Sequence, residues 1–134
     1  MRRIEVSCAI IEDNGLVLAA QRGAQMDLPG KWEFPGGKIR AGEDPRECIC
    51  REILEELGLE VKVVASLNPC EHSYIHLRVR LHPFVCRVTG GRLRLSEHRA
   101  VHWAGGTELS SLDWAQADIE VLKAYQGYLE GESG

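Results

Sequence analysis

Alternation of apolar and polar residues predicts several β-strands in this chain. The clearest case is the segment 75–88, in which every second residue from Ile75 to Leu81 is apolar and the residues between are polar. Successive side chains of a strand point to opposite faces of a sheet, so this segment has one apolar and one polar face. Segments rich in β-branched and apolar residues predict further strands at 4–11, 16–21, 31–34, 60–67 and 100–104.

A helix is predicted over residues 45–57 by the signals at its two ends. Asp44 suits the N-cap, Pro45 suits the first helical position, and Glu47 would complete a capping box with Asp44. Gly58 follows the last apolar residue, and glycine readily takes the left-handed conformation of a helix C-cap. The helix should therefore end at the residue before this glycine.

A second helix is predicted over residues 112–129, where Ile119, Leu122 and Tyr125 recur at helical spacing. Strands before, between and after two helices indicate an α/β fold with a mixed sheet covered on both faces. A chain of 134 residues has room for one domain with its own core. We expect this domain at residues 1–130, followed by a frayed tail at 131–134.

One face of the first helix is strongly acidic. Glu52, Glu55 and Glu56 sit at i, i+3 and i+4, so their carboxylates lie within an arc of about 100°. The apolar residues of the helix fall on the opposite side and can bury against the sheet: Cys50, Ile53, Leu54 and Leu57. Such a cluster is either a solvated acidic face or a site for a hard cation such as Mg²⁺, which prefers oxygen ligands.

The loop before this helix contains a glycine pair, Gly36 and Gly37. Glycines allow close backbone approach, although turns also use such pairs commonly. Next to a carboxylate cluster, this loop is suited to hold Mg²⁺ against a pyrophosphate. The metal would neutralise the substrate, activate water and stabilise the leaving group.

Charge and composition exclude several other classes of protein. The net charge of −4 disfavours a nucleic-acid polymer as partner, because polymer-binding proteins usually carry a basic stripe. The chain has no long uncharged apolar run, and we expect no signal peptide. Its five cysteines are an odd number and form no CxxC pair. The five histidines lack the spacing of a zinc site, so we expect them on polar faces or loops. We therefore expect a cytoplasmic monomer or homodimer without a membrane partner.

The acidic helix belongs to a longer motif that identifies a family. Gly37, five residues, Glu43, seven residues and the run REILEELGL from Arg51 to Leu59 match the Nudix box, G-x5-E-x7-R-E-U-x-E-E-x-G-U, at every defined position. The chain thus resembles the Nudix hydrolases along nearly its full length. This resemblance implies an α/β/α sandwich with a mixed β-sheet and a catalytic loop-helix-loop. It also implies hydrolysis of a phosphoanhydride bond with Mg²⁺, Mn²⁺ being an alternative.

The resemblance also implies roles for the residues of the box. The implied metal ligands are Glu52, Glu55, Glu56 and the carbonyl of Gly36. Arg51 would orient a box glutamate, the alternative being a plain helix ion pair with Glu55 at i+4. Glu43 would support the site, with Gly37 and Gly58 as structural glycines of the box.

A closer resemblance to MutT-type enzymes concerns the residues around the box. Gln21-Arg22 and the run WEFPGGKI at 32–39 look like the corresponding region of those enzymes. The resemblance implies that Arg22 contacts substrate phosphate, with Gly37 and Lys38 also at the substrate. Glu97 precedes a late Trp-containing strand and would be a metal ligand or general base, the alternative being an exposed loop carboxylate. Either Glu52 or Glu97 would deprotonate the attacking water.

The resemblance implies a nucleoside triphosphate as substrate, with nucleoside monophosphate and pyrophosphate as products. Asp118, near the start of the last helix, stands where MutT-type enzymes read the base. An ionised carboxylate only accepts hydrogen bonds, so it would accept from N7–H of 8-oxoguanine or from an exocyclic amine. 8-Oxo-dGTP and (d)CTP or modified cytidine triphosphates are therefore the candidate substrates, and an N-cap role for Asp118 is the alternative. A non-catalytic binding module is a further alternative, although such modules lose box glutamates that this chain keeps.

Overall fold

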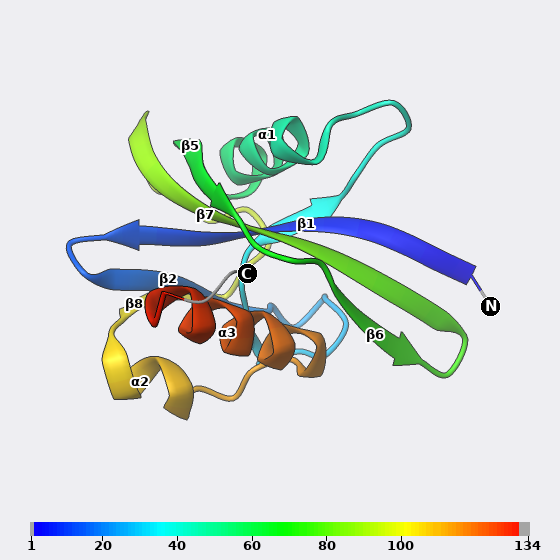
Figure 1. The fold of residues 1–134 in the computed structure, drawn as a ribbon. Coiled ribbons are helices and arrows are strands. Elements are labelled where there is room, and N and C mark those ends of the chain that lie inside the picture. Colours follow the sequence, from blue (N-terminus) through cyan, green and yellow to red (C-terminus); the bar gives the residue numbers. More distant parts are fainter. Residues whose placement is uncertain (1, 132–134) are drawn as a thin grey trace.

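The computed structural model in Figure 1 describes residues 2–131, which form a twisted mixed sheet with helices on both sides. The strands within this range are β1 (Arg2–Asp13), β2 (Leu16–Gln21), β3 (Trp32–Glu33), β4 (Gly36–Lys38), β5 (Leu59–Ser66), β6 (Cys70–Tyr74), β7 (Leu77–Gly91) and β8 (Ala100–Ala104). The helices are α1 (Pro45–Leu57), α2 (Gly106–Ser111) and α3 (Gln116–Leu129). The α/β architecture expected from the sequence is confirmed.

The sheet has the strand order β3-β2-β1-β7-β5, and β4, β6 and β8 pair with β1, β7 and β2. Strands β1 and β7 are parallel over a long register, from Arg2 opposite Leu77 to Glu12 opposite Arg87. The neighbours of this central pair join it antiparallel, which makes the sheet mixed. Strand β4 lies beside β1 and carries the glycine-rich loop into the sheet immediately before α1.

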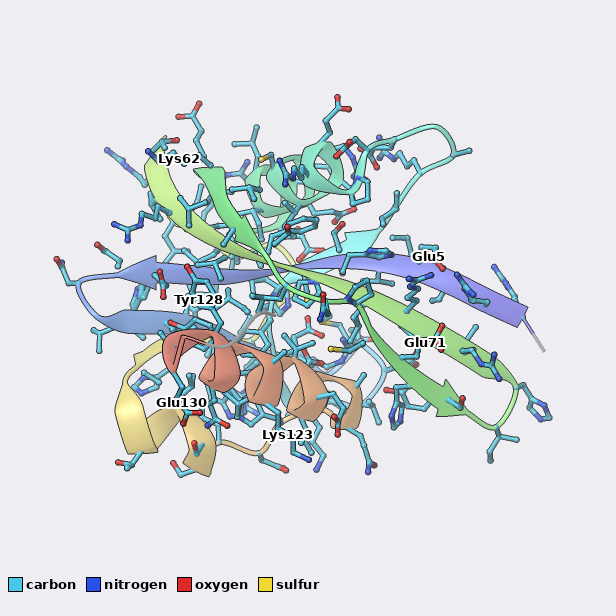
Figure 2. The ribbon with its side chains drawn as sticks, in the orientation of Figure 1. Glu5, Lys62, Glu71, Lys123, Tyr128 and Glu130 are labelled. Carbon is cyan, nitrogen blue, oxygen red and sulfur yellow. The ribbon has the colours of Figure 1, made fainter. Side chains whose placement is uncertain are left out.

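Each face of the sheet has its own apolar core. Because side chains alternate along β1, Ile10 packs in the cluster beneath α3, whereas Ile11 packs in the cluster beneath α1. Figure 1 shows α1 on one side of the sheet and α2 with α3 on the other. Fully burying a side chain of this size contributes roughly 1.5–3 kcal/mol. Lys123 on α3 and Glu130, the residue after its end, are exposed and are labelled in Figure 2.

Helix α1 begins and ends at the predicted residues, with small differences in its caps and packing. The Asp44 side chain accepts a hydrogen bond from the amide of Arg46, two residues on, rather than from Glu47 as a capping box requires. Gly58 has φ 71° and forms the left-handed C-cap. Leu54 was expected in the core but is 48% exposed, because it lies at the margin of the apolar face.

The predicted strand at 75–88 is instead the second arm of a hairpin. Strand β6 ends at Tyr74 and β7 begins at Leu77, with these two residues paired. Ile75 therefore lies at the hairpin tip and is 85% exposed, rather than on the apolar face of a strand. Strand β7 also continues beyond residue 88 to Gly91, because this end pairs with Leu59 of β5.

The predicted helix at 112–129 is shorter at its start. Residues 112–115 are not helical, because the amide of Ala115 donates to the Trp32 carbonyl (2.8 Å) and the Trp32 amide donates to the Asp113 carbonyl (2.9 Å). This pairing extends the β3 edge and delays the start of α3 to Gln116. Helix α2 was not predicted. The tertiary pairing sets the start of α3 and hence the position of Asp118.

Among residues 2–131, no helix is long and apolar enough to cross a membrane. The frayed tail expected at 131–134 falls, except for Gly131, on residues outside the described range.

Candidate active site

The glycine pair brings its loop into direct contact with β1 and α1. A Cβ on Gly36 would overlap the carbonyl oxygen of Ser7 in the paired strand. A Cβ on Gly37 would overlap the carboxylate of Glu52 on α1. Only glycine fits at Gly36, whereas a side chain at Gly37 would displace the Glu52 carboxylate, so the backbone of this loop lies against the acidic face of the helix.

Arg51 is the centre of an ion-pair cluster on α1. Its Nε and Nη2 contact the two oxygens of Glu43 at 2.8 and 3.0 Å, and its Nη1 lies 2.8 Å from Glu52 Oε1 and 3.2 Å from Glu55 Oε2. The bidentate pair lowers the pKa of Glu43 to about 2. The structure therefore brings Arg51 together with Glu43 and Glu52, and the expected i,i+4 pair with Glu55 is only one contact of several.

Glu56 is partly buried, and its Oε2 lies 3.9 Å from Nδ1 of His98. Burial, and after it the neighbouring carboxylates of Glu52, Glu33 and Glu97, together raise the pKa of Glu56 to about 8. Its Oε2 is buried and has no hydrogen-bond partner among residues 2–131. A buried carboxylate oxygen without a hydrogen-bond partner is unfavourable. A bound cation would provide the missing partner, so this position is suited to one.

The loop that carries Glu97 is fixed to the end of α1. The amides of Arg92, Arg94 and Ser96 donate to the carbonyls of Gly58, Leu57 and Glu56, at 3.1, 2.9 and 3.2 Å. These bonds satisfy carbonyls that a helix terminus otherwise leaves unpaired. The Glu97 side chain is exposed, yet it is near enough to contribute to the raised pKa of Glu56. The structure thus brings Glu97 beside the predicted metal ligand Glu56.

Two residues of the site were missed from the sequence. His98 was expected on a polar face or in a loop and was given no role at the site; it lies in the loop before β8, where its side chain is 1% exposed and its Nε2 lies 2.7 Å from Glu33 Oε2. The other oxygen of Glu33 accepts a hydrogen bond from Arg22 Nη1. Arg22 also donates through Nε to the carbonyl of Asp27. Glu33 therefore joins the predicted phosphate-binding arginine to a buried histidine.

A cavity of about 550 Å³ lies next to these residues. Six of the predicted site residues line this cavity: Arg22, Gly36, Gly37, Lys38, Glu56 and Asp118. Its size is typical of a pocket for a small ligand. Apolar side chains of β1 and β7, such as Val6 and Val79, complete the lining.

Asp118 is not the N-cap of the last helix. Ala115 holds that position, and Asp118 lies in the first turn with its Oδ1 accepting from the Phe34 amide at 2.9 Å. Burial raises the pKa of Asp118 to about 8, so its carboxyl is mostly protonated at neutral pH. The expected carboxylate that only accepts corresponds to the ionised form, and a protonated carboxyl differs from it. A neutral carboxyl accepts through one oxygen and donates through the other.

The residues of the acidic face fit a divalent cation by their chemistry. Among residues 2–131, no three acidic, histidine or cysteine side chains are gathered closely enough to hold an ion as they stand. Glu52 and Glu55 are instead turned to Arg51. However, crowded carboxylates and the unpartnered oxygen of Glu56 are the donors that Mg²⁺ or Mn²⁺ prefer. Rotation of the glutamate side chains would be needed to complete the coordination.

Comparisons with known proteins identify the family of this chain. The family model described as NUDIX domain matches residues 1–125. The chain is 38% identical over 125 residues to the CTP pyrophosphohydrolase of Escherichia coli K12, covering 93% of each chain. It is also 38% identical over 119 residues to the putative 8-oxo-dGTP diphosphatase 2 of Mycobacterium tuberculosis H37Rv, covering 88% of this chain and 84% of that protein.

Solved structures give the same result. The solution structure of the Escherichia coli ORF135 protein is similar with a TM-score of 0.83 and 36% identity, covering 98% of this chain and 94% of that one. The MutT protein from Methanosarcina mazei Go1 shares the fold, with a TM-score of 0.84 at 22% identity and 96% coverage of both chains. The chain belongs to the NUDIX family. It is a Nudix hydrolase, and the family expected from the sequence is confirmed.

Proposed function

We propose that this chain is a MutT-like nucleoside triphosphate pyrophosphohydrolase that releases nucleoside monophosphate and pyrophosphate with the help of Mg²⁺ or Mn²⁺. The observation that carries the proposal is a single cavity lined by Arg22, the glycine loop, Glu56 and Asp118. Groups suited to phosphate, cation and base thus face the same space, at a volume suited to one nucleotide.

The phosphate end of the site is assigned to basic side chains and to the loop. Arg22 is held by Glu33 and by the Asp27 carbonyl, so its guanidinium is oriented before substrate arrives. Lys38 lines the same cavity and adds positive charge. A divalent cation, when bound, neutralises phosphate charge and lowers the pKa of water.

The carboxylates of α1 and its neighbouring loop are assigned to the cation and to proton removal. Glu52, Glu55, Glu56 and the carbonyl of Gly36 are the proposed ligands, with Glu97 beside them. Glu52 and Glu97 are the two candidates for the general base. Glu52 accepts a hydrogen bond from Arg51, whereas Glu97 is exposed to the water that would attack.

Asp118 is the proposed reader of the base. Its protonated carboxyl presents a donor beside an acceptor. 8-Oxoguanine offers the matching pair, because its N7–H donates and its O6 accepts. Unoxidised guanine has acceptors at both N7 and O6 and would leave one carboxyl oxygen facing another acceptor. This complementarity supports 8-oxo-dGTP as a substrate.

Cytidine triphosphates are the second candidate substrates. Cytosine carries an amine donor beside the N3 acceptor, so it also complements a neutral carboxyl. The 38% identity to a CTP pyrophosphohydrolase over 93% of both chains supports this alternative.

A panel of triphosphates tests the proposal and separates the two substrates. Pyrophosphate release would be measured with Mg²⁺ from 8-oxo-dGTP, dGTP, dCTP, CTP and 5-methyl-dCTP, each with an EDTA control. We expect metal-dependent release and a kcat/KM preference for 8-oxo-dGTP over dGTP. A preference for the cytidine nucleotides would assign the second substrate class. No release from any of them would refute the proposed activity and favour a non-catalytic binding module.

A further inference from the structure

A buried imidazole lies between the two parts of the site. The His98 side chain is 1% exposed, although the neighbouring Glu97 is exposed. Its Nε2 is 2.7 Å from Glu33 Oε2, and its Nδ1 is 3.9 Å from Glu56 Oε2. His98 therefore stands between the carboxylate that contacts Arg22 and a carboxylate proposed for the cation.

The hydrogen bonds around Glu33 determine the tautomer of this ring. A carboxylate accepts, so the nitrogen that contacts it must carry a proton. His98 thus donates through Nε2, and a neutral ring leaves Nδ1 as an acceptor that has no hydrogen-bond partner within residues 2–131. Glu33 then accepts one bond from His98 and one from Arg22, with a different oxygen for each.

The backbone fixes the position of the ring. On one side of His98 the amide of Ser96 donates to the Glu56 carbonyl (3.2 Å), and on the other the amide of Arg99 donates to the Gln21 carbonyl (2.9 Å). Gly23 lies against the carbonyl of Glu97 so closely that a Cβ there would overlap it. The loop is thus held between the end of α1 and the end of β2, and His98 is a rigid support for Glu33.

We propose that His98 is a positioning residue that, through Glu33, holds the Arg22 guanidinium in the orientation that receives the triphosphate. The inference deepens the proposed function and rests on it for the contact between Arg22 and phosphate. Without the bond from His98, one oxygen of Glu33 loses its partner and the carboxylate can turn. Arg22 then loses the fixed acceptor that orients its long side chain.

The first experiment reads the orientation of Arg22 without substrate. Solvent exchange of the Arg22 Nη1–H, the group that contacts Glu33, would be followed by NMR in the wild type, in His98→Asn and in His98→Gln. An asparagine amide is too short to reach Glu33, whereas a glutamine amide reaches close to the position of Nε2. We expect exchange to be several-fold faster in His98→Asn and largely restored in His98→Gln. Unchanged exchange in His98→Asn would overturn the proposal.

The second experiment is a double-mutant cycle on hydrolysis. Losing a hydrogen bond to a charged group should raise KM of the preferred triphosphate roughly tenfold in His98→Asn, with a smaller change in kcat. If His98 acts through Arg22, the double variant with Arg22→Ala should be no worse than Arg22→Ala alone. Losses that multiply would show that His98 acts independently of Arg22, which contradicts the proposal.

Two controls separate positioning from general stability. His102 also contacts a glutamate, Glu108 at 3.1 Å, but on the surface, so His102→Asn should leave KM unchanged. If His98→Asn does not fold, Glu33→Gln replaces it and should loosen Arg22 in the same NMR measurement. If the wild type hydrolyses none of the triphosphates, the proposed function fails, while the exchange of the Arg22 Nη1–H still decides the role of His98.

Discussion

At the scale of single residues, the site depends on carboxylates held in different environments. Glu43 is fixed in a bidentate pair with Arg51, which lowers its pKa to about 2. Burial and neighbouring carboxylates raise the pKa of Glu56 to about 8, and burial does the same for Asp118. Residues with the same functional group are thus suited to three tasks: structural support, cation binding and base recognition.

Replacing Glu56 by glutamine should separate activity from stability. The amide keeps the shape but removes a charge proposed to bind the cation, so we expect kcat to fall by roughly 100-fold or more. Because the Glu56 oxygen is buried and unpartnered, Glu56→Gln should not lower the melting temperature in EDTA. Pyrophosphate release and thermal denaturation would be measured beside Glu60→Gln, an exposed control. Near-normal turnover of Glu56→Gln would refute its assignment to the cation site.

Asp118 should make stability depend on pH. Its pKa is raised from 3.8 to about 8 by folding, so the folded state keeps a proton that the unfolded state has released between these values. Its contribution is therefore fully present below pH 3.8 and is lost as pH rises through about 8. In this window stability should fall by at most about 1.4 kcal/mol per pH unit from this group.

The variant Asp118→Asn should remove this dependence while keeping an acceptor for the Phe34 amide. Unfolding by urea at pH 5 and at pH 8.5 would measure it. The stability of Asp118→Asn relative to the wild type should be greater at the higher pH, whereas the exposed control Asp113→Asn should show no such trend. Parallel pH profiles for wild type and Asp118→Asn would contradict the buried, protonated carboxyl.

At the scale of elements, local signals explain what the sequence could predict, and tertiary pairing explains part of what it could not. Helix α1 was predicted to the residue because Asp44 and Gly58 carry its end signals in the local sequence. The β6–β7 hairpin was missed because its tip, Ile75-His76, contains no glycine, asparagine or proline. The start of the last helix was wrong because backbone pairing with the distant Trp32 overrides local helical preference.

The loop before α1 should separate stability from activity at two adjacent glycines. A Cβ on Gly36 meets the backbone of Ser7, which cannot move without disturbing β1, so Gly36→Ala should unfold at clearly lower temperature. A Cβ on Gly37 meets only the carboxylate of Glu52, which can rotate away. Gly37→Ala should therefore stay folded but lose most activity, because Glu52 is displaced.

Thermal denaturation and pyrophosphate release would measure both glycine variants. Gly42→Ala is the control, since nothing lies near its Cβ and only its positive φ is unfavourable, which destabilises by about 1 kcal/mol. Equal loss of stability in Gly36→Ala and Gly37→Ala would contradict the assigned contacts.

At the scale of the whole molecule, the sheet brings together residues that are far apart in sequence. Strand β2 pairs with both β3 and β8, with Ala20 opposite Glu33 and Gln21 opposite Ala100. This arrangement places Glu33 beside His98, although 65 residues separate them. The acidic helix could be predicted because its carboxylates are neighbours on one helix. The Glu33–His98 contact could not, because it depends on strand pairing that leaves no periodic signal in the sequence.

Metal should stabilise the whole domain through α1. A ligand that binds only the folded state stabilises it by RT ln(1 + [L]/Kd), about 2.7 kcal/mol at 100 times Kd. For a domain of this size we expect the melting temperature to rise by several degrees on adding Mg²⁺ or Mn²⁺, and EDTA should reverse the rise. The crowding of Glu56 by Glu52, Glu33 and Glu97 supplies the repulsion that a cation relieves. The rise should therefore be largely lost in Glu56→Gln but kept in Glu60→Gln, and an equal rise in both variants would place the cation elsewhere.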